Sequence, residues 1–236
     1  MNREAFLKRV RDAAESGLRY RVHTDKSITR AMGYSTVEGD LVAKFVSEVA
    51  KVGGRAVSVS SMEAARTEAA NVFRTYEPRS ALCWRHPVLD RFGLVDWLYQ
   101  QRVSQVDSKS LARLSPSEQR SDMLAADIGI TSCTWALAET GSLVMAHDTD
   151  NERVASLVPP VYLAIVSREQ IVADLFDVYD RLGERFAERK DGRWPSNVTL
   201  ITGPSKTGDI ESNLVVGVHG PGKWHVIVVD EPAAVS

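Results

Sequence analysis

Two near-continuous apolar runs constrain the fold of this chain more than any other sequence feature. They occupy residues 141–146 and 161–166. Strands with one solvated face alternate apolar and polar residues, whereas strands covered on both faces are apolar throughout. We therefore expect a sheet that is covered by other elements on both sides.

The rest of the chain alternates short strand patterns with longer helical ones. Further strand patterns occupy residues 55–59, 80–84, 198–201 and 224–229. Short strands separated by helices of roughly ten or more residues favour a mostly parallel sheet. The predicted fold class is α/β, a three-layer α/β/α sandwich with a mostly parallel sheet and an additional N-terminal helical segment. We expect residues 1–36 to form that helix and an arm, and residues 37–236 to form the α/β domain.

Three local predictions concern the connections between strands. A helix is expected to end at Glu139-Thr140-Gly141, just before the first apolar run. Ser167 and Gln170 have the spacing of a capping box, which predicts a helix that runs from Ile171. Residues 85–114 show no clear period and are expected to form loops and short helices.

Composition excludes several classes of function. The net charge of −2 provides no basic field for nucleic acid. No apolar run is long enough to span a membrane, and the charged N-terminal segment does not resemble a signal peptide, so we expect a cytoplasmic protein.

The chain has only Cys83 and Cys133, too few for a four-cysteine iron–sulfur cluster or zinc site. Cys83 is expected to be buried, and Cys133, in a hydroxyl-rich loop, to be accessible. The histidines lack metal-ligand spacing, so no metal is expected.

Two glycine-rich loops in the last quarter of the chain are candidate anion sites. The first, residues 202–208, follows an apolar run and is expected to lead into an acidic helix start; the second, residues 217–222, carries His219. Such loops present backbone N–H groups and hydroxyls to an anion. The alternative is an ordinary strand–turn–helix connection. The candidate anion-binding residues of the first loop and of the acidic segment after it are Thr202, Gly203, Ser205, Lys206, Thr207, Asp209 and Glu211.

Two further groups complete the candidate site. Glu139, Thr140 and Gly141 are expected at a sheet edge, where ligands of open α/β sheets bind. Arg153 is a candidate bidentate clamp for a carboxylate or phosphate. Histidine is the side-chain type whose ordinary pKa lies closest to neutrality, so His219, together with Glu139, is a candidate catalytic acid or base. The alternative for the Glu139-Thr140-Gly141 motif is an ordinary turn. The alternative for Arg153 is a surface salt bridge, and for His219 a structural hydrogen bond.

Taken in order, these motifs resemble the lactate-utilisation protein C family, whose shared module is the LUD domain. The resemblance covers about residues 40–230, and its most specific parts are Thr-Gly-Pro-Ser-Lys-Thr-Gly-Asp-Ile-Glu and Gly-Val-His-Gly-Pro. Ser142 stands where threonine is usual, and Gly208 where alanine is usual. The resemblance implies a sugar-isomerase/CoA-transferase-like fold. It also implies a role in oxidising L-lactate to pyruvate beside two partner proteins that carry iron–sulfur clusters.

The predicted function is a cluster-free, non-redox subunit of such an L-lactate oxidation system, which binds a small carboxylate or phosphate and has no intrinsic cofactor. One alternative is a stand-alone CoA-transferase or sugar-phosphate isomerase, in which Glu139 would be the nucleophile or base. Another is a non-catalytic scaffold for the iron–sulfur partners. Exposed tryptophans at Trp84 and Trp97 would then form its interface.

Overall fold

The computed structural model describes residues 2–18, 37–147, 153–187, 195, 197–208 and 214–231. The chain divides into two compact units, residues 1–36 and 37–236. In the first unit, helix α1 (Arg3–Leu18) confirms the predicted N-terminal helix and exposes Phe6 and Val10. The expected arm at residues 20–36 lies outside the described residues.

The second unit is built around a six-stranded sheet. Its strands, in spatial order, are β1 (Arg55–Val59), β12 (Lys223–Val229), β7 (Val161–Ser167), β4 (Ile128–Thr131), β2 (Ser80–Cys83) and β3 (Ser104–Val106). Every neighbouring pair is parallel. The predicted α/β fold with a mostly parallel sheet is therefore confirmed.

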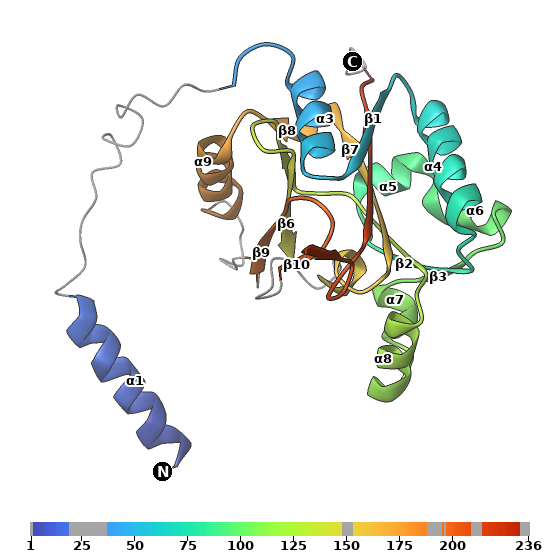
Figure 1. The fold of residues 1–236 in the computed structure, drawn as a ribbon. Helices are drawn as coiled ribbons and strands as arrows, with labels where there is room; N and C mark the ends of the chain where they lie inside the picture. Colours follow the sequence, from blue (N-terminus) through green and yellow to red (C-terminus); the bar gives the residue numbers. More distant parts are fainter. Residues whose placement is uncertain are drawn as a thin grey trace. The chain divides into compact units, whose positions relative to one another are not determined.

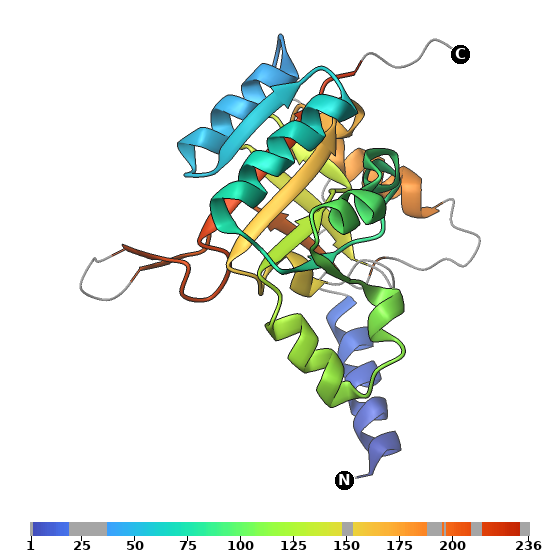
Figure 2. The ribbon, with the colours of Figure 1, turned by 90° about the vertical axis from the view of Figure 1, so that its right-hand side faces the viewer.

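Helices cover one face of this sheet. Figures 1 and 2 show α4 (Met62–Tyr76), α5 (Pro87–Phe92) and α6 (Leu94–Gln100) on this side. Helix α3 (Leu41–Lys51) packs against β1. Short helices α7 (Ser108–Leu111) and α8 (Pro116–Leu124) connect β3 to β4, and a capping box between Ser115 and Glu118 begins α8.

A second sheet covers the opposite face. Its strands, in spatial order, are β8 (Ile171–Val172), β5 (Trp135–Leu137), β6 (Ser142–His147) and β9 (Asn197–Ile201). In β6, Leu143 and Met145 belong to the main core, whereas Val144 and Ala146 pack with helix α9 (Leu175–Ala187). Strand β6 is therefore apolar throughout because both its faces are covered, one by the parallel sheet and one by α9.

Two helix predictions around the second sheet are wrong. The residues before Glu139 form strand β5, which pairs antiparallel with β6, and not a helix. Ser167 does make a capping box with Gln170, but it caps a single 3₁₀ turn (Arg168–Gln170), after which Ile171 enters β8. Helix α9 begins later, where the Asp174 carboxylate accepts hydrogen bonds from the backbone N–H groups of Phe176 and Asp177.

Burial also overturns two expectations about single residues. Cys133 is fully buried and not accessible, and burial raises the pKa of its thiol, as it does for the buried Cys83. Trp84 and Trp97 are only 2% and 6% exposed, so they do not form an exposed interface. Trp97 instead packs edge-to-face with Phe73 and Phe92 in the core.

His225 makes stability depend on pH. Its imidazole lies between β12 and α4, with Nε2 3.1 Å from the Tyr76 hydroxyl. Burial, helped by the positive charges of Arg55 and Lys223, lowers the pKa of His225 from 6.5 to about 4. As the pH falls, His225 is therefore protonated at a higher pH in the unfolded chain than in the folded protein. The stability that neutral His225 provides is complete above about pH 6.5 and is lost as the pH falls through about 4.

We predict that His225→Gln is less stable than the wild type near pH 7.5, because it packs less well. The deficit should shrink by about 2 kcal/mol near pH 5, because only the wild type loses stability by protonating residue 225. Urea unfolding of both proteins at the two pH values measures this difference. A deficit that does not change with pH would show that His225 is not held neutral.

Candidate functional site

The two glycine-rich loops meet at a cavity of about 310 Å³, here called the glycine-loop pocket. Thr202, Gly203, Ser205, Lys206 and His219 from these loops all line it. Tyr162 and Trp224, the second residues of β7 and β12, form part of its wall. The pocket therefore lies at the amino ends of these parallel strands, opposite to the edge where open α/β sheets usually bind ligands.

Hydrogen bonds between the loops fix the shape of the pocket. The Ser205 N–H donates to the Pro221 carbonyl at 2.8 Å, and the Gly217 N–H donates to the Ser205 carbonyl at 2.9 Å. Beyond Ser205 the chain forms strand β10 (Lys206–Gly208), which pairs antiparallel with β11 (Leu214–Val216). The first loop thus leads into a strand and not directly into a helix. Asp209 and Glu211 lie outside the described residues.

The end of helix α3 positions the lysine of the pocket. Lys206 Nζ donates to the carbonyl of Val52, the C-cap residue of α3, at 2.6 Å. Cations are favoured at helix C-termini because the last carbonyls are unpaired and carry partial negative charge. Gly203 has a φ of +92°, and a Cβ there would stand 2.7 Å from the same carbonyl oxygen. Gly203 therefore lets the loop approach α3 closely enough for Lys206 to be anchored.

A chain of hydroxyl groups connects the Glu-Thr-Gly motif to the pocket. Thr140 Oγ1 lies 2.7 Å from Ser142 Oγ, which lies 2.6 Å from Oγ1 of the pocket-lining Thr202. Gly141 has a φ of +66°, and a Cβ there would stand 2.5 Å from the backbone nitrogen of Val49. Close packing against α3 and its C-cap residue therefore accounts for the glycine at both position 141 and position 203.

The remaining predicted residues that the structure describes do not line the pocket. Glu139 is half-buried, and its backbone N–H donates to the Ala173 carbonyl. Arg153 is exposed, and its carbonyl accepts a hydrogen bond from the hydroxyl of Ser156, which does line the cavity. Thr207 is paired with Val215 in the β10–β11 hairpin. The structure therefore brings Lys206 and His219 together in one pocket, and Glu139 and Arg153 are not among the residues that line it.

Trp224 is the pocket residue that sequence reasoning missed. Its side chain is 2% exposed, and its Nε1 donor is buried without a hydrogen-bond partner among the described residues. Buried polar groups without a partner are rare in native proteins. A tryptophan at the start of an apolar strand resembles ordinary core, so the available signal was its place directly after the second glycine-rich loop.

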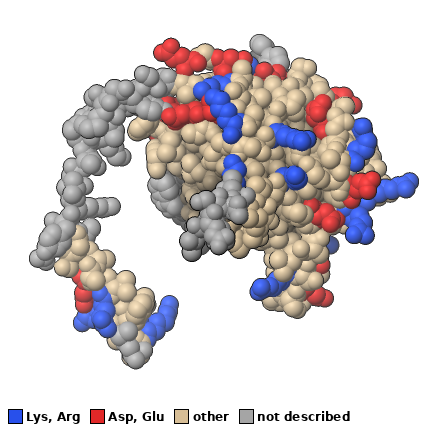
Figure 3. All heavy atoms as spheres, viewed as in Figure 1, with Lys and Arg blue, Asp and Glu red and all other residues tan. Residues whose placement is uncertain are grey.

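Two further absences apply to the described part of the chain. Within it, no group of three or more His, Cys, Asp or Glu side chains is placed to hold a metal ion. No helix in the same residues has the length and apolar character needed to cross a membrane. On the face in Figure 3, Lys and Arg side chains are interspersed with Asp and Glu and form no continuous basic area.

Comparisons with known proteins place these motifs in context. The LUD domain family matches residues 42–229. Lactate utilization protein C from Halalkalibacterium halodurans is 37% identical over 161 residues, which cover 68% of this chain and 67% of that protein. Lactate utilization protein C from Geobacillus sp. (strain WCH70) is 29% identical over 237 residues, which cover 98% of this chain and 96% of that protein.

A solved structure has the same fold. A DUF162 family protein from Deinococcus radiodurans aligns with a TM-score of 0.54 at 22% identity, over 80% of this chain and 96% of that chain. At this identity the likeness supports the arrangement of strands and helices and carries no information about ligands. The family match nevertheless covers both glycine-rich loops and both strands that wall the pocket.

Proposed function

The chain belongs to the LUD domain family, and from this membership we propose that it takes part in lactate utilisation as a subunit of an L-lactate oxidation system. We propose further that it binds a small carboxylate, lactate or pyruvate, in the glycine-loop pocket and does not itself carry electrons. Its relatives named lactate utilization protein C support the first statement. The chemistry of the pocket supports the second.

The observation that carries the binding proposal is the set of donors around one cavity. Lys206 brings a positive charge whose position is fixed by the Val52 carbonyl, and an ammonium group has further protons to donate. The buried N–H of Trp224 lacks an acceptor among the described residues. A carboxylate offers several acceptor positions, so one bound ligand would accept from Lys206, and it would also accept from the buried Trp224 N–H once the pocket wall shifts to expose that atom.

In this proposal the other pocket residues orient the ligand and handle a proton. The Thr202 hydroxyl, held by Ser142, would bond the ligand hydroxyl or carbonyl oxygen. His219 is exposed at the mouth of the pocket and would exchange a proton with that oxygen. We propose that the electrons pass to partner proteins that carry iron–sulfur clusters, as the resemblance to the lactate-utilisation family implies.

Growth on L-lactate tests the proposal. In a strain that lacks the native protein, the chain with His219→Ala should fail to restore growth on L-lactate while leaving growth on glucose normal. The neighbouring Val218→Ala, an exposed position that does not line the pocket, should restore growth fully and is the matched control. Normal growth of the His219→Ala strain at equal protein levels would contradict the assigned role of His219.

A further inference from the structure

A second cavity, of about 470 Å³, shares no lining residue with the glycine-loop pocket. It is here called the strand-end cavity, because Trp84 and Arg85 directly follow β2, and Asp107 directly follows β3. These neighbouring parallel strands present their carboxyl ends there, which is the usual ligand-binding edge of an open α/β sheet. Most of the cavity lining lies in residues 85–114, the segment without a clear sequence period.

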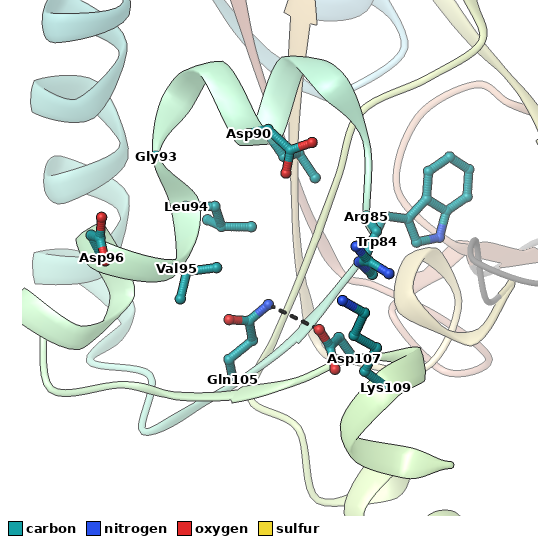
Figure 4. Close-up of a pocket in the computed structure, with 11 residues that line it drawn as sticks. Trp84, Arg85, Asp90, Gly93, Leu94, Val95, Asp96, Gln105, Asp107 and Lys109 are labelled. Carbon is teal, nitrogen blue, oxygen red and sulfur yellow. Dashed lines mark hydrogen bonds between the residues drawn. The ribbon is translucent and has the colours of Figure 1, made fainter.

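Two cations, Arg85 and Lys109, line the strand-end cavity, together with the carboxylates of Asp90, Asp96 and Asp107. Arg85 and Lys109 are exposed, and neither forms an ion pair with a residue that the structure describes. Other arginines at this edge are paired, because Arg91 and Arg168 contact Glu169 and Asp230. In the view of Figure 4, Arg85 and Lys109 lie on the same side of the cavity. Two neighbouring cations favour a dianionic group such as a phosphate ester.

The nearby carboxylate of Asp107 is already engaged. Its Oδ1 accepts a hydrogen bond from the Ser110 N–H at 2.8 Å, which caps α7. Its Oδ2 accepts one from Gln105 Nε2 at 3.5 Å, drawn as the dashed line in Figure 4. Both carboxylate oxygens of Asp107 are therefore engaged in the wall of the cavity, and neither forms an ion pair with Arg85 or Lys109.

The rest of the lining suits the non-phosphate part of a nucleotide. Leu94 and Val95 give the cavity an apolar side, on which a planar base could pack. The exposed carboxylates of Asp90 and Asp96 can accept hydrogen bonds from hydroxyl or amino groups. The cavity, at about 470 Å³, lies within the roughly 300–1,000 Å³ that is typical of small-molecule sites and is larger than the glycine-loop pocket.

We propose that the strand-end cavity is a second binding site, and that it takes a nucleoside monophosphate. The phosphate lies between Arg85 and Lys109, the base packs on Leu94 and Val95, and Asp90 and Asp96 accept hydrogen bonds from hydroxyl and amino groups. This site is independent of the carboxylate proposed for the glycine-loop pocket. It gives the chain a means of responding to a phosphorylated compound that is not the oxidised substrate.

Calorimetric titration of the full chain with AMP tests the proposal, and adenosine and inorganic phosphate are titrated in parallel. AMP should bind more tightly than either compound alone. Arg85→Gln and Lys109→Ala should each weaken AMP binding by about tenfold or more, which is the usual effect of losing a charge-assisted hydrogen bond. Arg113→Ala, an exposed cation near Lys109 that does not line the cavity, should bind AMP normally.

Further readouts separate binding at this site from other effects. Melting temperatures of the variants should match the wild type, because Arg85 and Lys109 form no ion pair with a described residue. Lys206→Met in the glycine-loop pocket should leave AMP binding unchanged. The proposal is overturned if AMP does not bind the wild type at millimolar concentration. It is equally overturned if adenosine binds as well as AMP, or if the Arg85 and Lys109 variants bind AMP normally.

Discussion

Replacing Gly129 by alanine should destabilise the protein by about 4 kcal/mol or more, an effect as large as single substitutions usually reach. Gly129 lies in the buried strand β4, and a Cβ there would stand 1.7 Å from the carbonyl oxygen of Ala155. Ala155 belongs to the 3₁₀ helix η1 (Arg153–Ser156), which packs on β4. The overlap is between backbone and backbone, so no side-chain rotation relieves it. Either the sheet or η1 must move.

Urea unfolding of the purified Gly129→Ala protein measures this cost. Gly183→Ala is the matched control, because Gly183 lies in α9 with no atom within 4 Å of an added Cβ. Alanine there should be neutral or stabilise the helix by up to about 1 kcal/mol. If Gly129→Ala is as stable as the wild type, η1 does not pack on β4 as described. Ser156 and Leu157, which line the glycine-loop pocket, would then also be misplaced.

Lys206→Met should weaken the binding of pyruvate and lactate by about tenfold or more, because the pocket loses the cation that faces the carboxylate. Methionine retains the length and apolar character of the lysine stem, so the walls of the pocket should change little. Calorimetric titration with each acid measures the affinity.

Lys51→Met provides the control for Lys206→Met. Lys51 is an exposed lysine at the end of the same helix α3, where it pairs with Glu48 and does not line the pocket. Its replacement should leave carboxylate binding unchanged. Equal affinities of the wild type and Lys206→Met would show that Lys206 serves only to cap α3.

The sequence predicted the parallel sheet because its strands carry a strong local signal. Residues 161–166 are apolar throughout, residues 224–229 are apolar except for His225, and both form interior strands of the sheet, β7 and β12. The second sheet could not be predicted in the same way. Strand β8 has two residues and β5 has three, too few to show a period. Their pairing is decided by tertiary contacts with β6 and α9.

The residues of the candidate site also differ in whether a local sequence pattern could reveal them. The glycine motifs marked Lys206 and His219 as candidates, and the structure places both in one cavity. The contact that fixes Lys206 joins it to Val52, which is 154 positions away in sequence. A contact of this kind leaves no local pattern. Trp224 and the strand-end cavity were missed for the same reason, because their significance depends on which distant residues surround them.

Titration of the wild-type chain with pyruvate and with its uncharged amide, pyruvamide, tests the central claim most directly. The two compounds have nearly the same shape and differ in the carboxylate. We predict that pyruvate binds saturably and that pyruvamide binds at least about tenfold more weakly, because Lys206 and the Trp224 N–H would meet no charged acceptor. If neither compound binds at millimolar concentration, or if both bind equally well, the glycine-loop pocket is not a carboxylate site.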